Sequence, residues 1–436
     1  MIKELKSPLR IVLDNYGKIN PESIEEYIAQ DGYKAVGKVL REMEPGQVVG
    51  EIKASGLQGR GGAAFPTGSK WEFTAKAKDT PKYIICNADE GEPGTFKDRA
   101  ILEGDPHKII EGMIIAGYAV GAHHGYIYIR GEYLLSINRF YKALQQAKEQ
   151  GFLGEDILGS GFNFQIDIHQ GAGSYVCGEE TALMESLEGK RGNPRFKPPF
   201  PPSRGLWKKP TVINNVETLA NIGSIILKGA EWFRSFGTKE CPGTKVYAIS
   251  GHVKEVGVIE APMGITLREI ITEYARGMRD GKFKMAQVGG TAGAILGEDM
   301  LDVPLDYTSL KEKGLVLGSG AILVMNETTC AVDMLKCFLN FFKRESCGKC
   351  IPCRVGTEKL LQLATAISQR KGKEADIDLM LHTAKVMQKT SLCALGQSPI
   401  LPIYTILKYF KEEVTEHIKG RCPTGVCKSC FLEFSL

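Results

Sequence analysis

No run of about 18 consecutive apolar residues occurs in the 436-residue chain, so the sequence predicts no helix that crosses a membrane. The best candidate, residues 109–122, is interrupted by Glu111 and by glycines. The N-terminal residues MIKELKSPLR lack the apolar core of a secretory signal. These absences predict a cytoplasmic protein with no direct membrane span.

A large excess of charge of one sign is also missing. The formal net charge is +4, and such a near-neutral balance argues against nucleic acid as a partner. Apolar residues make up 43% of the chain and charged residues 24%, which is typical of a globular protein that buries its own core. At roughly 100–200 residues per domain, the length predicts two to four domains.

Cysteine is scarce in most of the chain and abundant near its end. Only Cys86, Cys177 and Cys241 precede residue 330, whereas nine of the twelve cysteines lie between Cys330 and Cys430. Disulfides are rare in the cytoplasm, so cysteines clustered in this way indicate metal or redox chemistry.

Hydrophobic periodicity suggests several structural units along the chain. Residues 1–54 form an N-terminal helical segment, and strands alternate with helices over 55–243, which is typical of an α/β domain. Short strands and one helix over 244–328 predict a small α+β domain. Helices are expected over 329–412, followed by a cysteine-rich metal-binding tail at 413–436.

The first of three unusual segments is GLQGRGGAAFPTGSKW, residues 56–71. Its glycines let backbone N–H groups approach a phosphate, and Arg60 and Lys70 add positive charge. The segment lacks the G-x-G-x-x-G spacing of a dinucleotide-binding loop. A plain turn is the alternative interpretation.

Two further segments carry carboxylates beside glycines. NADEGEPGTFKDR, residues 87–99, is suited to accept hydrogen bonds from sugar hydroxyls or ring N–H groups, although a solvated acidic loop is the alternative. GAGSYVCGEETAL, residues 171–183, runs into a helix. Glu179 and Glu180 in its first turn either cap that helix or bind donors of a nucleotide.

The cysteine-rich region contains two candidate metal sites. SCGKCIPCR presents Cys347, Cys350 and Cys353 in a C-x-x-C-x-x-C pattern, and Cys393 follows. Three thiolates at this spacing favour a 4Fe–4S cluster, whereas zinc sites usually use two separated pairs.

The tail sequence H-x4-C-x4-C-x2-C contains His417, Cys422, Cys427 and Cys430. Its ligand count fits a closed zinc site. An iron–sulfur cluster completed by Cys330 or Cys337 is a second possibility, and a disordered tail is a third.

Together, these segments resemble the flavoprotein NADH-oxidising (diaphorase) subunit of respiratory complex I and of NAD-linked, electron-bifurcating hydrogenases and formate dehydrogenases. The matching motifs also include PRFKPPFPPSRGLW, INNVETL and SLCALG, and they occur in the order of that family over residues 55–400. The resemblance implies a Rossmann-like FMN/NAD-binding α/β domain, a small β-grasp-like domain and a C-terminal helical bundle that carries an iron–sulfur cluster.

The resemblance also implies roles for individual residues. The residues expected to bind FMN are Gly59, Arg60, Gly61, Lys70, Asn87, Asp89, Glu90, Tyr175, Gly178, Asn214, Asn215 and Thr218. The residues expected to bind NAD(H) are Phe65 and Phe73, stacked on the adenine, with Glu92, Glu180 and Lys197. Cys347, Cys350, Cys353 and Cys393 would bind the 4Fe–4S cluster. Cys330, His417, Cys422 and Cys427 resemble the zinc site of the bifurcating branch, with Cys430 as a competing ligand.

The implied activity is NADH:acceptor oxidoreduction. A hydride passes from NADH to FMN, and single electrons then pass to the 4Fe–4S cluster and to a partner, with electron bifurcation as an open possibility. The implied partners are a thioredoxin-like 2Fe–2S subunit and a further iron–sulfur catalytic subunit. The flavin carries the chemistry, so no side chain is expected to act as a catalytic acid or base. A non-catalytic, zinc-stabilised scaffold subunit is the alternative.

Overall fold

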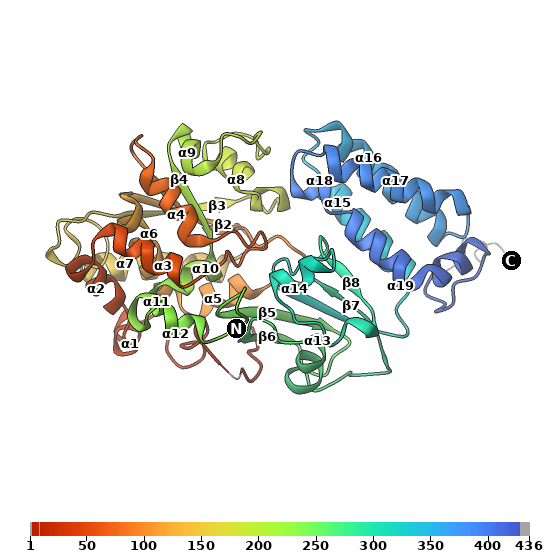
Figure 1. Ribbon diagram of the computed structural model, residues 1–436, viewed down its shortest axis with the longest axis horizontal. Helices are drawn as coiled ribbons and strands as arrows, with labels where there is room; N and C mark the ends of the chain where they lie inside the picture. Colours follow the sequence, from red (N-terminus) through yellow and green to blue (C-terminus); the bar gives the residue numbers. More distant parts are fainter. Residues whose placement is uncertain (1, 8, 428–436) are drawn as a thin grey trace.

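The computed structural model describes residues 2–7 and 9–427, which form an elongated molecule with three structural units (Figure 1). The N-terminal helices lie at one end of the molecule and the C-terminal helices at the other (Figure 1). Among the described residues, no helix is both long enough and apolar enough to cross a membrane.

The first unit is built on a sheet of four parallel strands in the order β3-β2-β1-β4. The strands are β1 (Tyr83–Ala88), β2 (His124–Arg130), β3 (Gln165–Gly171) and β4 (Thr211–Asn215). The helices are α1 (Ile24–Ala29), α2 (Lys34–Glu42), α3 (Pro45–Ala54), α4 (Thr67–Lys76), α5 (Lys97–Gly104), α6 (Pro106–Val120), α7 (Leu134–Glu149), α8 (Glu180–Leu187), α9 (Pro201–Arg204), α10 (Val216–Ala220), α11 (Ile222–Lys228) and α12 (Ala230–Arg234).

Helix α6 contains most of the apolar stretch at residues 109–122. The Asp105 side chain accepts the Lys108 N–H at the start of this helix, and Gly121 ends it with a φ of 74°. Almost every residue of α6 is buried, so the helix lies in the core of the first unit rather than in a membrane. The apolar stretch at residues 109–122 is therefore accounted for by a buried helix that ends at Val120.

The second unit is a mixed five-stranded sheet in the order β6-β5-β9-β7-β8. Its strands are β5 (Thr244–Gly251), β6 (Gly257–Pro262), β7 (Phe283–Val288), β8 (Ala294–Leu296) and β9 (Ala321–Asn326), and its helices are α13 (Leu267–Glu269) and α14 (Tyr307–Glu312). The central pair, β5 and β9, is parallel, and the other pairs are antiparallel. This arrangement is the one expected of a β-grasp-like domain.

The third unit is entirely helical among the described residues. It contains α15 (Ala331–Glu345), α16 (Ile351–Ser368), α17 (Glu374–Thr390), α18 (Ala394–Gln397) and α19 (Ile400–Ile418). The boundary expected between residues 412 and 413 falls inside α19. The expected fold class, an α/β protein with a parallel sheet and a C-terminal helical region, is confirmed.

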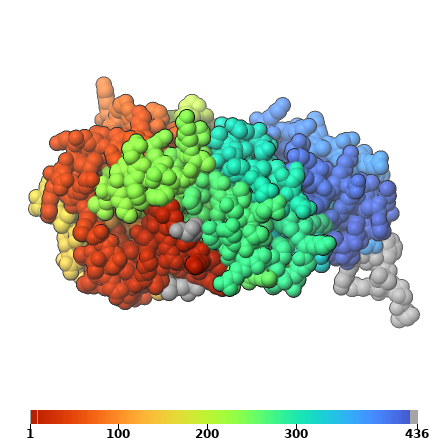
Figure 2. All heavy atoms as spheres, turned by 60° about the horizontal axis from the view of Figure 1, so that its bottom comes forward, coloured from red at the N-terminus to blue at the C-terminus, as the bar shows by residue number. Residues whose placement is uncertain are grey.

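The N-terminal segment joins the first two units. The Glu260 carboxylate on β6 accepts the backbone N–H groups of Ile11, Val12 and Leu13 at 2.8–3.0 Å. The Leu5 N–H donates to the Val258 carbonyl at 2.8 Å. In the space-filling view, the start of the chain accordingly lies against the second unit (Figure 2).

Candidate functional site

The segments identified from the sequence meet at one edge of the parallel sheet. Asn87 near the end of β1 lies opposite Asn215 at the end of β4. The Asn87 side chain donates to the Gly178 carbonyl at 2.9 Å, which attaches the third segment to the same edge. Ligands of open α/β sheets bind beyond the carboxyl ends of the strands, so this edge is the candidate binding site.

The glycine-rich segment is a closed loop between α3 and α4. The Gly59 N–H donates to the Phe65 carbonyl at 2.9 Å, and Gly62 has a φ of 124°, a conformation that favours glycine. A Cβ atom on Gly61 would lie 3.1 Å from the Asn215 Cβ. The loop therefore packs against the end of β4 with little room for a side chain.

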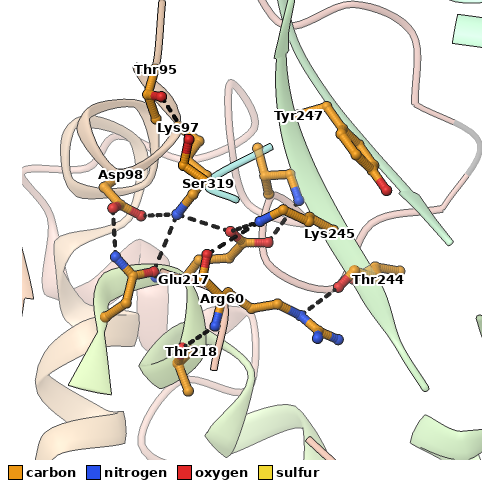
Figure 3. Close-up of polar contacts among 12 residues, drawn as sticks. Arg60, Thr95, Lys97, Asp98, Glu217, Thr218, Thr244, Lys245, Tyr247 and Ser319 are labelled. Carbon is orange, nitrogen blue, oxygen red and sulfur yellow. Dashed lines mark hydrogen bonds and ion pairs between the residues drawn. The ribbon is translucent and has the colours of Figure 1, made fainter. Parts of the chain in front are cut away.

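Arg60 and Lys70, the two cations of this loop, have different surroundings. Arg60 is fully buried, and its guanidinium donates to the carbonyls of Thr244 and Pro242 at 3.0 and 2.7 Å. Its backbone N–H donates to the Thr218 hydroxyl at 2.8 Å. Lys70 donates to the Ile213 carbonyl, and burial lowers its pKa. Arg60 thus braces the loop from behind, and its guanidinium points into the seam with the second unit (Figure 3).

Asn214, at the end of β4, contacts the core rather than open space. Its side-chain carbonyl accepts the indole N–H of Trp71 at 2.9 Å, and Trp71 is fully buried. Trp71 therefore packs in the core, and its ring does not present a stacking face.

Asp89 is the unusual member of the acidic segment. Its side chain is 8% exposed, and neither carboxylate oxygen has a hydrogen-bond partner among the described residues. Burial raises the pKa of Asp89 to about 7. A buried polar group without partners is costly, and a bound ligand that donates hydrogen bonds would remove that cost.

Glu90 has a structural role in the same segment. Its carboxylate accepts the N–H groups of Asp98 and Arg99 at 2.9 and 3.0 Å, which satisfies the first turn of α5. Burial raises the pKa of Glu90 to about 7, and the nearby Asp98 carboxylate contributes to that rise. Glu90 thus shapes the loop that carries Asp89.

Glu92 joins the first and second structural units and contacts Tyr175, which reaches the third. Its carboxylate accepts the Tyr175 hydroxyl at 2.7 Å and the Ala292 N–H of the second unit at 3.2 Å. The Tyr175 N–H in turn donates to Glu345, at the end of α15, at 3.0 Å. Burial raises the pKa of Glu92. The acidic loop is therefore attached to the second unit directly by Glu92 and to the third unit through Tyr175.

The third segment presents an ion-paired group at the start of α8. Glu179 caps the helix by accepting the N–H groups of Thr181 and Ala182. The Lys197 ammonium lies 2.6 Å from Glu180 and 3.0 Å from Glu179. Glu179 therefore caps the helix, as one of the two interpretations predicted, and Glu180 pairs with a lysine at the surface.

Aromatic side chains are exposed around this edge. Phe65 and Phe73 are 46% and 54% exposed, as faces that stack on a ligand should be. Phe196 and Phe200 are exposed even more, at 74% and 56%. These two residues follow the third segment in the proline-rich stretch and were not among the expected site residues.

The four cysteines expected to hold the cluster line one small cavity. Cys347, Cys350, Cys353 and Cys393 surround it together with Val176 and Pro194 of the first unit. Burial raises the pKa values of Cys353 and Cys393 to about 11, so a positive metal centre is needed to hold them as thiolates. Four convergent thiols with no other ligand type fit an iron–sulfur cluster.

A second group of metal-binding side chains lies at the end of α19. The ligand atoms of Cys330, His417, Cys422 and Cys427 all lie within 4.8 Å of one another, and all four residues are buried. The His417 Nδ1 atom lies 2.7 Å from the Glu413 carbonyl. Cys337 is exposed and lies outside this group. Cys430 falls outside the described residues.

Two family descriptions match the chain. Residues 52–224 match the Nuo51 FMN-binding domain. Residues 333–417 match the NADH-ubiquinone oxidoreductase-F iron–sulfur binding region. The first range contains the three segments at the sheet edge, and the second contains the four-cysteine cavity.

Relatives that align with nearly the whole chain point to the same family as these two descriptions. The HndC subunit of the NADP-reducing hydrogenase of Solidesulfovibrio fructosivorans is 50% identical over 97% of this chain and 86% of its own length. An F subunit of the NADH-quinone oxidoreductase of Rhizobium meliloti is 46% identical over 95% of this chain and 99% of its own length. The chain belongs to the family of NADH-quinone oxidoreductase F subunits.

A solved structure shows the same architecture as this member of the F-subunit family. The NAD⁺-reducing [NiFe]-hydrogenase in its H₂-reduced state superposes with a TM-score of 0.84 at 32% identity, over 96% of this chain and 68% of the other. The expected FMN and 4Fe–4S cofactors are confirmed by the two family descriptions. The relatives are named as subunits, which supports a place in a larger complex.

The sequence did not predict which residues of the second unit contact the flavin-binding unit of this chain. The Tyr307 hydroxyl donates to the Gly59 carbonyl at 3.2 Å, and Lys245 donates to the Arg60 carbonyl at 3.2 Å. The hydroxyls of Ser319 and Thr95 lie 2.8 Å apart. No local motif marks these residues, because their partners are more than 180 positions away in the chain.

Proposed function

We propose that this chain oxidises NADH at bound FMN and delivers single electrons through its 4Fe–4S cluster to a partner iron–sulfur subunit. FMN, when bound, supplies the chemistry that accepts an electron pair from a nicotinamide and releases it in single steps. The protein binds both molecules, orients them and excludes water. No side chain is required as an acid or base.

The observation that carries this proposal is a loop shared by the two cofactor sites. Val176 lines the four-cysteine cavity. Its neighbour Tyr175 donates its hydroxyl to Glu92 of the acidic loop at 2.7 Å. One short segment therefore forms a wall of the cluster cavity and also contacts the proposed flavin and nucleotide site, as electron transfer between the two requires.

The sheet-edge residues divide between the flavin and the nucleotide. The glycine-rich loop, Asn215, Gly178 and Asp89 would hold the flavin, with the buried Asp89 carboxylate as an acceptor for its hydrogen bonds. Phe65 and Phe73 would bind the adenine of NADH. The Glu180–Lys197 pair, with its atoms 2.6 Å apart, lies toward the ribose. Arg60, Glu90 and Glu92 hold these loops in position through their hydrogen bonds.

The partners we propose are a thioredoxin-like 2Fe–2S subunit and a further iron–sulfur catalytic subunit. A single 4Fe–4S cluster carries one electron at a time, so electrons taken from NADH must leave for another protein. We propose a division into an FMN/NADH-binding unit (55–243), a β-grasp-like unit (244–328) and a cluster-bearing unit (329–412). The units pack tightly on one another, because the hydrophobic core of the helical unit also contains Ile85 and Val176 of the first unit and Met285 of the second.

For the group at the end of α19, we propose one bound zinc ion with Cys330, His417, Cys422 and Cys427 as ligands. Sulfurs in a tetrahedral zinc site lie roughly 3.7 Å apart, and the Cys330 and Cys427 sulfurs are separated by 3.6 Å. The Cys330 sulfur lies 3.4 Å from the His417 Nε2. With Nε2 on the metal, the His417 Nδ1–H donates to the Glu413 carbonyl and fixes the ring.

The test of the electron path uses Cys393→Ala, with the exposed Cys337→Ala as its matched control. In the anaerobically reconstituted Cys393→Ala chain, NADH should still bleach the flavin absorbance, because that step precedes reduction of the cluster. The EPR signal of the reduced cluster should be lost in Cys393→Ala and retained in Cys337→Ala. A wild-type chain without flavin, or one whose flavin NADH does not bleach, would contradict the proposed function.

A further inference from the structure

The first two structural units meet at a buried group of charged side chains that the proposed chemistry does not use. Arg60, Lys97 and Lys245 supply three cations, and Asp98 and Glu217 supply two carboxylates (Figure 3). Each of the five side chains is at most 3% exposed. Lys245 comes from β5 of the second unit, and the others come from the flavin-binding unit.

Glu217 is at the centre of this group. Its carboxylate lies 2.9 Å from the Lys97 ammonium and 3.2 Å from the Lys245 ammonium. Lys97 also lies 2.6 Å from Asp98. Glu217 is thus shared by two lysines that come from different units, and Lys97 has Asp98 as a second partner.

Arg60 has no carboxylate within ion-pair distance among the described residues. Its guanidinium donates to the carbonyls of Thr244, Pro242 and Gln58 instead. A further carboxylate, Glu90, binds the N–H groups at the start of α5. Burial raises the pKa of Glu90 to about 7 and lowers the pKa of Lys245 to about 8. At pH 7 Glu90 therefore only partly offsets the third cation, while Lys245 is still mostly protonated. The group therefore carries a buried excess of positive charge.

This excess lies directly behind the glycine-rich loop. Lys245 donates to the Arg60 carbonyl in the middle of that loop at 3.2 Å. Lys97 lies 3.1 Å from the side-chain oxygen of Asn215, against which Gly61 packs. Burying an uncompensated charge is costly, so an anion bound in front of the loop would be stabilised by these cations. Such attraction acts over several ångströms at low dielectric and needs no direct contact.

We propose that Lys245 completes a buried cationic group behind the Gly59–Gly62 loop that stabilises the phosphate of the bound flavin and so selects FMN over riboflavin. This inference rests on the proposed function, in which that loop binds FMN. Lys245 is then a positioning residue: it holds the loop through the Arg60 carbonyl and contributes its charge from behind. The second unit thereby takes part in cofactor choice.

The experiment measures the dissociation constants of FMN and riboflavin for the flavin-free full chain, by quenching of flavin fluorescence. Lys245→Met should weaken FMN binding by about tenfold or more, the effect of about 1.4 kcal/mol, and should change riboflavin binding by less than about twofold. Glu217→Gln should raise the preference for FMN above that of the wild type, because it removes a negative charge. The matched control is Lys82→Met, which replaces another buried lysine that donates to a backbone carbonyl, that of Ala75.

The double variant Lys245→Met/Glu217→Gln removes one charge of each sign and keeps the excess. Its preference for FMN should therefore return close to that of the wild type, and Glu217→Gln should exceed it. This comparison tests the inference even if Lys245→Met alone does not fold. Equal weakening of both flavins in Lys245→Met, or an unchanged preference, would overturn the inference. A wild type that binds neither flavin would overturn the proposed function itself.

Discussion

Replacing Asp89 by asparagine should stabilise the flavin-free protein at alkaline pH while weakening its hold on FMN. Burial raises the pKa of Asp89 from an ordinary value of 3.8 to about 7. The folded chain therefore keeps a proton that the unfolded chain loses within this window. Stability falls as the pH rises from about 4 to about 7 and then stays low. Each pH unit costs about 1.4 kcal/mol, so the whole window costs up to about 4 kcal/mol.

Asparagine carries no charge between pH 4 and pH 8, so the Asp89→Asn variant should not lose stability as the pH rises. Thermal unfolding of the flavin-free wild type and Asp89→Asn should give similar midpoints near pH 4. At pH 8, the midpoint of the variant should be higher by the equivalent of about 2–4 kcal/mol, allowing for water that reaches the carboxylate. FMN affinity should fall in the same variant, because an acceptor of hydrogen bonds is lost. Parallel pH profiles for the two proteins would refute the reasoning.

Three further predictions concern the cofactors. Lys70→Glu should release FMN, because it places a carboxylate beside the glycine-rich loop; full flavin occupancy in the purified variant would count against the assignment. Glu180 should disfavour the extra phosphate of NADPH through like-charge repulsion. The wild type should therefore have a higher kcat/KM for NADH than for NADPH, and Glu180→Gln should reduce that difference. Because one relative is named as an NADP-reducing hydrogenase subunit, a preference of the wild type for NADPH is the result that would contradict this prediction. Metal analysis should find about four irons and one zinc per chain, whereas about two extra irons without zinc would contradict the proposed tail site.

Much of the site could be predicted from sequence because its chemistry is carried by local motifs. The C-x-x-C-x-x-C spacing indicates iron–sulfur ligands by itself, since three thiolates so near one another in sequence must also lie close in space. The glycine-rich loop and the acidic segment likewise carry their turn chemistry within about a dozen residues. Strands β1 and β2 coincide with short, largely apolar runs of the sequence, as is typical of buried parallel strands.

Other roles depend on residues that are distant in the chain, and only the tertiary structure could decide them. Arg60 looks like a phosphate ligand from its neighbours in sequence, yet its side chain points to Thr244 and Pro242, more than 180 positions away. Glu92 was expected at the nucleotide, and its bonds to Tyr175 and Ala292 show that it also attaches the acidic loop to the Tyr175 segment and to the second unit.

The sequence by itself pointed to an iron–sulfur cluster, because the spacing of Cys347, Cys350 and Cys353 is a local pattern that favours one. It pointed to FMN only through the combined resemblance of several motifs, since each glycine-rich segment alone is also compatible with a plain turn. It did not determine how the second unit bears on the flavin site. Lys245 lies in an ordinary apolar strand, TKVYAISG, and no pattern around it suggests a buried charge. Its role exists only because folding brings β5 against Glu217 and the Arg60 carbonyl. A buried ion pair is a property of two distant surfaces that meet, and a linear motif cannot encode it.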